Sequence, residues 1–117
     1  MTLEQRTALD RLNLDYKEVL ERFANNEELF IKCLHKFAAN NPYDGLIKAL
    51  EDRNVSDAFE AAHSLKGVSG NLGFKRLYSV IKEITEVFRA GSLEVSPEDM
   101  AELKDSYIEV LQVINSL

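Results

Sequence analysis

Apolar side chains recur every three or four residues through most of the chain, which is the spacing of an amphipathic α-helix. Between about residues 27 and 40 this spacing gathers one apolar face: Phe30, Ile31, Leu34, Phe37 and Ala38. Two asparagines and Pro42 then interrupt the pattern, because proline lacks a backbone donor and restricts the residue before it. The spacing resumes over residues 43–50, so we predict either one kinked helix or two helices in tandem.

The same spacing marks further helices before and after this segment. Two short helical pieces come first, a helix that contains His63 follows the tandem segment, and another helix runs from about 74 to 90. Ser96-Pro97 followed by two acidic residues is a strong start for the last helix. The connections are short, which favours antiparallel neighbours. We therefore predict an all-α fold with one domain over residues 1–117: an antiparallel up-down four-helix bundle with a short N-terminal helical cap.

Composition narrows the range of possible roles. The 117 residues are 45% hydrophobic, which is enough for one globular core. The net charge of −6 argues against nucleic acid as a partner, because phosphate backbones select basic surfaces. No apolar run reaches the roughly 18 residues of a membrane span, and the N-terminus shows no signal-peptide pattern. Cys33 is the only cysteine, which fits a reducing compartment. We expect a cytoplasmic monomer without membrane contact.

The helix around His63 has two unlike faces. A stripe of small and apolar residues can pack into a core: Ala58, Ala61, Ala62, Leu65, Val68, Ser69 and Leu72. The opposite side faces water and carries His63, Lys66, Gly67 and Gly70. Each glycine costs the helix about 1 kcal/mol relative to alanine, and clearance for something large that approaches the imidazole is the simplest reason to accept that cost. A lysine one turn from the histidine suits an anionic group such as a phosphoryl group.

One stretch of this helix has a recognisable order of residues. It reads His63-Ser64-Leu65-Lys66-Gly67, then Ser69 and Asn71-Leu72-Gly73. This order resembles the signature of histidine phosphotransfer (HPt) domains of bacterial multistep phosphorelays, and the run from Ala61 to Gly67 also resembles the phosphorylated N-terminal domain of chemotaxis kinases. The resemblance implies that His63 carries the phosphoryl group, that Lys66 supports it and that Gly67 leaves room for the partner.

The resemblance also implies partners. They are receiver domains of response regulators, whose phospho-aspartate is accompanied by Mg²⁺, and a hybrid sensor histidine kinase is a further candidate. The chain itself is expected to bind no cofactor and no metal. Gly70 and Phe59 are candidate docking residues, although Gly70 can instead help to end the helix and Phe59 can tuck sideways into the bundle.

Two further features near His63 concern the orientation of its ring and the charge around it. Many members of the resembled family carry an acid on the following helix that fixes the histidine tautomer, and this chain has Thr85 in that place. Glu60, one turn before His63, is therefore the candidate for orienting the imidazole. Lys75 and Arg76 add positive charge near the same end of an otherwise acidic chain, with an ordinary solvated face as the alternative.

The function predicted from these residues is that of a phosphorelay intermediate. We find no glycine-rich phosphate loop, so we predict a phosphoryl carrier without an ATP site. One alternative is a di-metal enzyme, because Glu60 and His63 have Glu-x-x-His spacing, but Lys32 stands three residues before His35, where a second such pair would need a glutamate. The other alternative is a non-catalytic helical interaction module without phosphoryl chemistry.

Overall fold

Helices make up all of the regular structure in this chain. The computed structural model describes residues 1–117 and contains seven helices: α1 (Leu3–Asp10), α2 (Tyr16–Glu21), α3 (Glu27–Ala39), α4 (Tyr43–Glu51), α5 (Val55–Leu72), α6 (Lys75–Arg89) and α7 (Pro97–Asn115). No residue forms a strand, so the predicted all-α class is confirmed. Two short helices, α1 and α2, precede α3, and the tandem alternative holds for α3 and α4.

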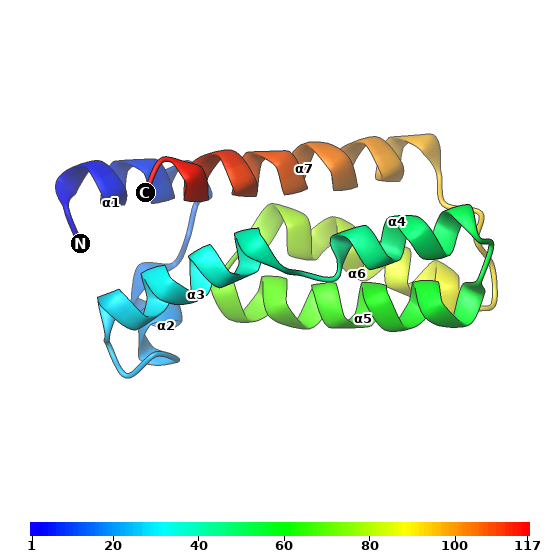
Figure 1. The fold of residues 1–117 in the computed structure, drawn as a ribbon, viewed down its shortest axis with the longest axis horizontal. Helices are drawn as coiled ribbons and strands as arrows, with labels where there is room; N and C mark the ends of the chain where they lie inside the picture. Colours follow the sequence, from blue (N-terminus) through cyan, green and yellow to red (C-terminus); the bar gives the residue numbers. More distant parts are fainter.

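Most helices lie along the long axis of the molecule, and successive helices from α4 to α7 run in opposite directions (Figure 1). Helix α5 packs against α4 and α6, while α7 packs against α6 and α3. Helix α1 lies against α7. Arg22, directly after α2, donates hydrogen bonds to carbonyls in the last turn of α5. The two N-terminal helices therefore contact different parts of the fold: α1 lies against α7, and the end of α2 lies against the last turn of α5. None of the seven helices combines the length and the apolar character that a membrane span needs.

The junction between α3 and α4 is held by the side chain of Asn41. Its amide nitrogen donates to the Phe37 carbonyl (2.8 Å) and to the Tyr107 hydroxyl (2.9 Å). Its amide oxygen accepts a hydrogen bond from the backbone N–H of Tyr43 (2.9 Å), whose ring stacks on Tyr107 with the centroids 3.8 Å apart. Pro42 has no N–H that could continue α3. These contacts separate the two helices and attach their junction to α7.

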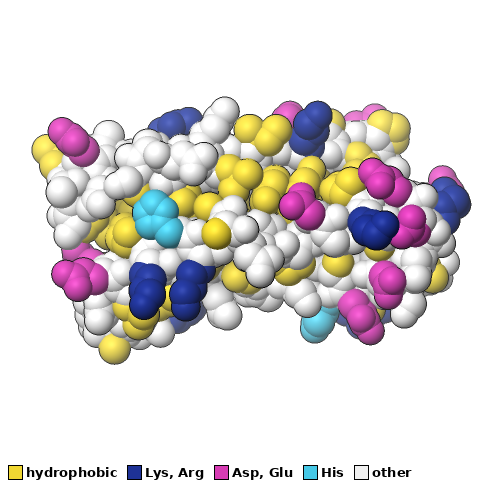
Figure 2. Space-filling view, viewed as in Figure 1, with side chains coloured by type: hydrophobic (Ala, Val, Ile, Leu, Met, Phe, Trp, Pro, Cys, Tyr) yellow, Lys and Arg dark blue, Asp and Glu magenta, His cyan; other side chains and the backbone are white.

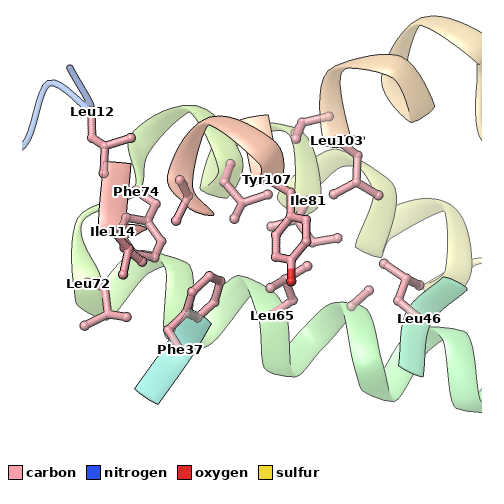
Figure 3. Close-up of a cluster of buried hydrophobic side chains, with 14 of the residues drawn as sticks. Leu12, Phe37, Leu46, Leu65, Leu72, Phe74, Ile81, Leu103, Tyr107 and Ile114 are labelled. Atoms are coloured by element: carbon pink, nitrogen blue, oxygen red, sulfur yellow. The ribbon is translucent and has the colours of Figure 1, made fainter. Parts of the chain in front are cut away.

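One cluster of apolar side chains between the helices sets the orientation of α5. Leu65 and Leu72 lie among side chains from other helices, including Phe37 of α3 and Ile81 of α6 (Figure 3). Leu65 has no exposed surface. Because burial of one leucine side chain contributes about 1.5–3 kcal/mol, rotation of α5 about its axis is strongly opposed. The opposite face of α5 is thereby held toward solvent.

Gly73 is the residue that ends helix α5. The backbone of this glycine is left-handed (φ 81°, ψ 22°), and the N–H of Phe74 donates to the Ser69 carbonyl at 2.9 Å, which closes the last turn. A Cβ atom added to Gly73 would lie 2.6 Å from Cγ2 of Val19 and 3.0 Å from Cδ2 of Leu14. Glycine is therefore required here both by the backbone conformation and by the close approach of the segment that contains α2.

Gly73→Ala is expected to lower the free energy of unfolding by at least about 2 kcal/mol, because a left-handed conformation costs other residues roughly 1–2 kcal/mol and the new methyl group overlaps Val19. Gly45→Ala is the matched control. Gly45 lies inside α4 with no atom within 4 Å of an added Cβ, so alanine should stabilise the protein by up to about 1 kcal/mol. Urea unfolding measures both variants, and equal stabilities would contradict this account of the helix end.

Candidate functional site

His63 lies near the middle of α5, on the face that points away from the core. Its side chain is exposed, whereas Ala62 and Leu65 beside it are fully buried. No side-chain hydrogen bond or ion pair of the protein involves the imidazole, so neither ring nitrogen has a partner within the chain. Figure 2 shows histidine side chains, in cyan, at two separate places on the surface. The other histidine, His35, belongs to α3.

The ring of Phe59 lies one helical turn before His63 and is half-buried against the core. The phenyl and imidazole rings stack with their centroids 5.9 Å apart and with 14° between their planes. The guanidinium carbon of Arg89, from the end of α6, lies 5.0 Å from the centre of the same phenyl ring. Phe59 thus packs against the bundle and contacts the imidazole at the same time.

Lys66 and Gly67 lie one turn after His63 on the same side of α5. Lys66 is half-buried and pairs with no carboxylate of the chain, which leaves its ammonium group available to an anion. Gly67 is exposed, and a Cβ added to it would have no atom within 4 Å. The helix surface beside the imidazole is therefore open at Gly67, in the geometry that the sequence predicts.

The predicted open surface does not extend to Gly70. A Cβ added there would lie 3.3 Å from two ring atoms of Tyr78, so this glycine lets the tyrosine ring of α6 pack against α5. Arg22 donates hydrogen bonds of 3.1 Å to the carbonyls of Gly70 and Asn71, which lie in the last turn of α5, where carbonyls lack the N–H group four residues on that would continue the helix. Gly70 also does not end the helix, because α5 continues to Leu72.

A groove borders the open surface at Gly67 and is a feature that sequence reasoning missed. It has a volume of about 410 Å³, and its lining joins Lys66, Gly67, Gly70 and Lys75 to residues of the α2 region, among them Asp15, Glu18 and Arg22. Tyr78 lines it as well. The amphipathic pattern of α2 indicates a helix but not which helix it contacts, so no local signal could place these residues beside the His63 face.

The structure gives His63 no partner that could hold its tautomer. Thr85 is fully buried, and its hydroxyl donates to the Ile81 carbonyl within α6 at 2.6 Å, so it faces the core. Glu60 is exposed and makes no hydrogen bond to the imidazole. In this structure no hydrogen bond supports the predicted role of Glu60 in orienting the imidazole.

The two cations after α5 have different environments. Arg76 donates from Nε to both carboxylate oxygens of Glu102 (3.1 and 3.0 Å) and lies 3.6 Å from a carboxylate oxygen of Glu109. The hydrogen bond from Arg76 lowers the pKa of Glu102, and the same bond raises the pKa of Arg76. The Arg76 guanidinium is thus paired with carboxylates of α7, whereas Lys75 is exposed and lines the groove.

The di-metal alternative requires carboxylates that converge on the histidine from inside a bundle. Glu60 and His63 instead both face solvent. No group of three or more His, Cys, Asp or Glu side chains is arranged to hold a metal ion.

A sequence model described as the Hpt domain matches residues 39–113. The chain belongs to the Hpt domain family. The matched segment contains α4, α5 and α6 with most of α7, and so it includes His63 and its neighbours on the exposed face. Hpt domains carry out histidine phosphotransfer in two-component phosphorelays, as phosphocarriers that interact with receiver domains.

The Hpt domain match confirms the resemblance noted from the His63 motif. Comparisons with curated proteins and with solved structures found no match. Residues 1–38, which form α1, α2 and nearly all of α3, lie outside the matched segment. The groove beside Gly67 is therefore built from the Hpt domain segment on one side and from α2 on the other.

Proposed function

We propose that His63 accepts a phosphoryl group from the aspartyl phosphate of a receiver domain and passes it to the aspartate of another receiver. The observation that carries this proposal is the exposed, unpaired imidazole of His63 beside the open surface at Gly67, within the segment that matches the Hpt domain. Lys66 adds a free cation where a phosphoryl group would sit. The receiver is expected to dock over Gly67.

The chemistry requires the neutral form of the imidazole, because only that form has a free lone pair on a ring nitrogen. Its unprotonated nitrogen attacks the phosphorus atom, and the P–O bond to the receiver's aspartate breaks with its electron pair left on the carboxylate. The second ring nitrogen keeps its proton, so the phosphorylated ring is cationic until that proton passes to water. Mg²⁺ on the receiver is expected to neutralise charge on the phosphoryl oxygens.

We also propose a specific arrangement of the helices. The antiparallel four-helix bundle is formed by α5, α6, α7 and the tandem of α3 and α4, with α1 and α2 as the cap and residues 1–117 as a single domain. The protein acts as a monomeric phosphoryl carrier that binds neither ATP nor a cofactor of its own. The lone Cys33 fits the reducing cytoplasm as the place where the relay operates.

Transfer of the phosphoryl group from His63 to a second receiver can be tested separately. The protein is first phosphorylated with phosphoramidate, a small donor that modifies histidine directly, and is then mixed with unphosphorylated receiver domains. Loss of the label from this protein, with matching gain by a receiver, is the expected result. Label that stays on the protein with every receiver tried would contradict the relay.

Lys66→Ala is expected to slow phosphorylation by a receiver by up to about fivefold without abolishing it, because an ion pair near the surface contributes roughly 0.2–1 kcal/mol. Lys104→Ala removes the same charge on α7 and is the control. Rates of phosphotransfer at low salt provide the measurement. An unchanged rate for Lys66→Ala would show that this lysine is only a solvated side chain.

A further inference from the structure

The orientation of the imidazole in this structure depends on a ring contact. The side chain of His63 has no hydrogen-bond partner, and neither Glu60 nor Thr85 reaches its second nitrogen. Its aromatic neighbour is Phe59, whose ring is nearly parallel to it (14°) with the centroids 5.9 Å apart. The stack is therefore the contact that restricts rotation of an otherwise free, exposed side chain.

Phe59 is itself held from two directions. It is half-buried and packs against the core beside Phe88 of α6, with which it lines a shallow depression. The guanidinium carbon of Arg89 lies 5.0 Å from the phenyl centre, within the range in which a cation is attracted by an aromatic face. Arg89 also donates from Nε to Glu86 at 2.7 Å, which limits its own movement. The contacts run from α6 through Phe59 to the imidazole.

We infer that Phe59 is a positioning residue that orients the imidazole of His63 for phosphoryl transfer, and that Arg89 supports Phe59 in this role. This inference rests on the proposed function. An unrestrained histidine occupies several staggered rotamers, whereas attack on phosphorus needs the nitrogen lone pair aligned with the bond that breaks. Stacking raises the population of a small set of orientations, and aromatic pairs of this kind change such populations by about two- to tenfold.

The kinetic test compares Phe59→Leu with Phe59→Tyr. Leucine keeps the apolar bulk but removes the ring, whereas tyrosine keeps the ring and serves as the rescue variant. The rate of transfer from a phosphorylated receiver is measured against receiver concentration. Phe59→Leu is expected to lower the maximal rate about three- to tenfold with an unchanged half-saturating concentration, and Phe59→Tyr is expected to stay within about twofold of the wild type.

A spectroscopic measurement tests the stack without any phosphoryl chemistry. The phenyl ring current should displace the imidazole C–H resonances of His63 from those of His35, which is exposed and stacks on no aromatic ring. In Phe59→Leu the His63 resonances should move to the values of a free histidine, while those of His35 stay in place. In Phe59→Tyr the displacement should persist.

Arg89→Met tests the support from α6. The change keeps a long apolar stem and removes the cation. The maximal rate should therefore fall about twofold, and the displacement of the His63 resonances should become smaller. Arg53→Met is the matched control, since Arg53 also pairs with a glutamate, Glu94 at 3.7 Å, and has no contact with Phe59. That control should leave both the rate and the resonances unchanged.

The outcomes separate this inference from the proposed function. If the wild-type protein takes no phosphate from any receiver, the proposed function is contradicted, whatever the His63 resonances show. A Phe59→Leu protein with the wild-type maximal rate overturns the inference alone. A variant in which only the half-saturating receiver concentration rises also overturns it, because Phe59 is then a docking contact.

Discussion

Replacing His63 with glutamine is expected to abolish phosphorylation while leaving the fold intact. Glutamine has no nucleophilic nitrogen, so the attack on phosphorus cannot occur. The imidazole is exposed and makes no hydrogen bond or ion pair, and surface substitutions of this kind usually change stability by no more than about 0.5 kcal/mol. Incorporation of labelled phosphate and thermal unfolding of the same sample measure the two effects.

His35→Gln is the control for this experiment. His35 is also exposed, but it lies on α3, outside the segment that matches the Hpt domain. This variant should be phosphorylated at the wild-type rate, and the bound phosphate should be labile in acid and stable in base, as a nitrogen–phosphorus bond requires. Labelling that disappears in His35→Gln and persists in His63→Gln would overturn the assignment of the acceptor.

Gly67→Gln is expected to have opposite effects on stability and on transfer. Glutamine is the better helix former by up to about 1 kcal/mol, and an added Cβ at Gly67 meets no atom of the protein. The melting temperature should therefore rise or stay unchanged. A receiver that lies over this part of α5 would collide with the new side chain, so phosphotransfer from the receiver should fall sharply. Phosphorylation by phosphoramidate should be far less affected, because a small donor needs no such clearance.

Gly45→Gln is the matched control for the steric effect. Gly45 lies in α4, is exposed, and likewise has open space around an added Cβ. The two variants should gain similar helix stability, but only Gly67→Gln should lose transfer from the receiver. A Gly67→Gln protein that accepts phosphate from its receiver at the wild-type rate would remove the steric role of this glycine.

Properties that depend on one helix at a time could be predicted from the sequence. The apolar stripe of α5 determines which side is buried, and so it also determines that His63 and Gly67 face solvent. The start of α7 at Pro97 and the end of α5 at Gly73 follow from backbone chemistry within a few residues. The order of residues around His63 carried enough information to identify the family.

Contacts between distant segments could not be predicted in this way. Arg22 and the Gly70 carbonyl are 48 residues apart, and Tyr78 reaches Gly70 from another helix. Periodicity gives the face of each helix but not the helix that covers it, so it places Gly70 on an open surface. The burial of Thr85 could not be predicted from its residue type either. Its hydroxyl is satisfied by the Ile81 carbonyl of its own helix, which allows a polar residue to be buried.

Phosphoryl transfer from a receiver to His63 is the step on which the proposed function depends. The most direct test loads receiver domains from the same genome with labelled phosphate, mixes each with the wild-type protein, and maps the modified residue by mass spectrometry at neutral or alkaline pH. At least one receiver should lose its label within minutes, and the phosphate should be found on His63. Transfer to any other residue, or no transfer from any receiver to a protein that phosphoramidate can still modify, would contradict it.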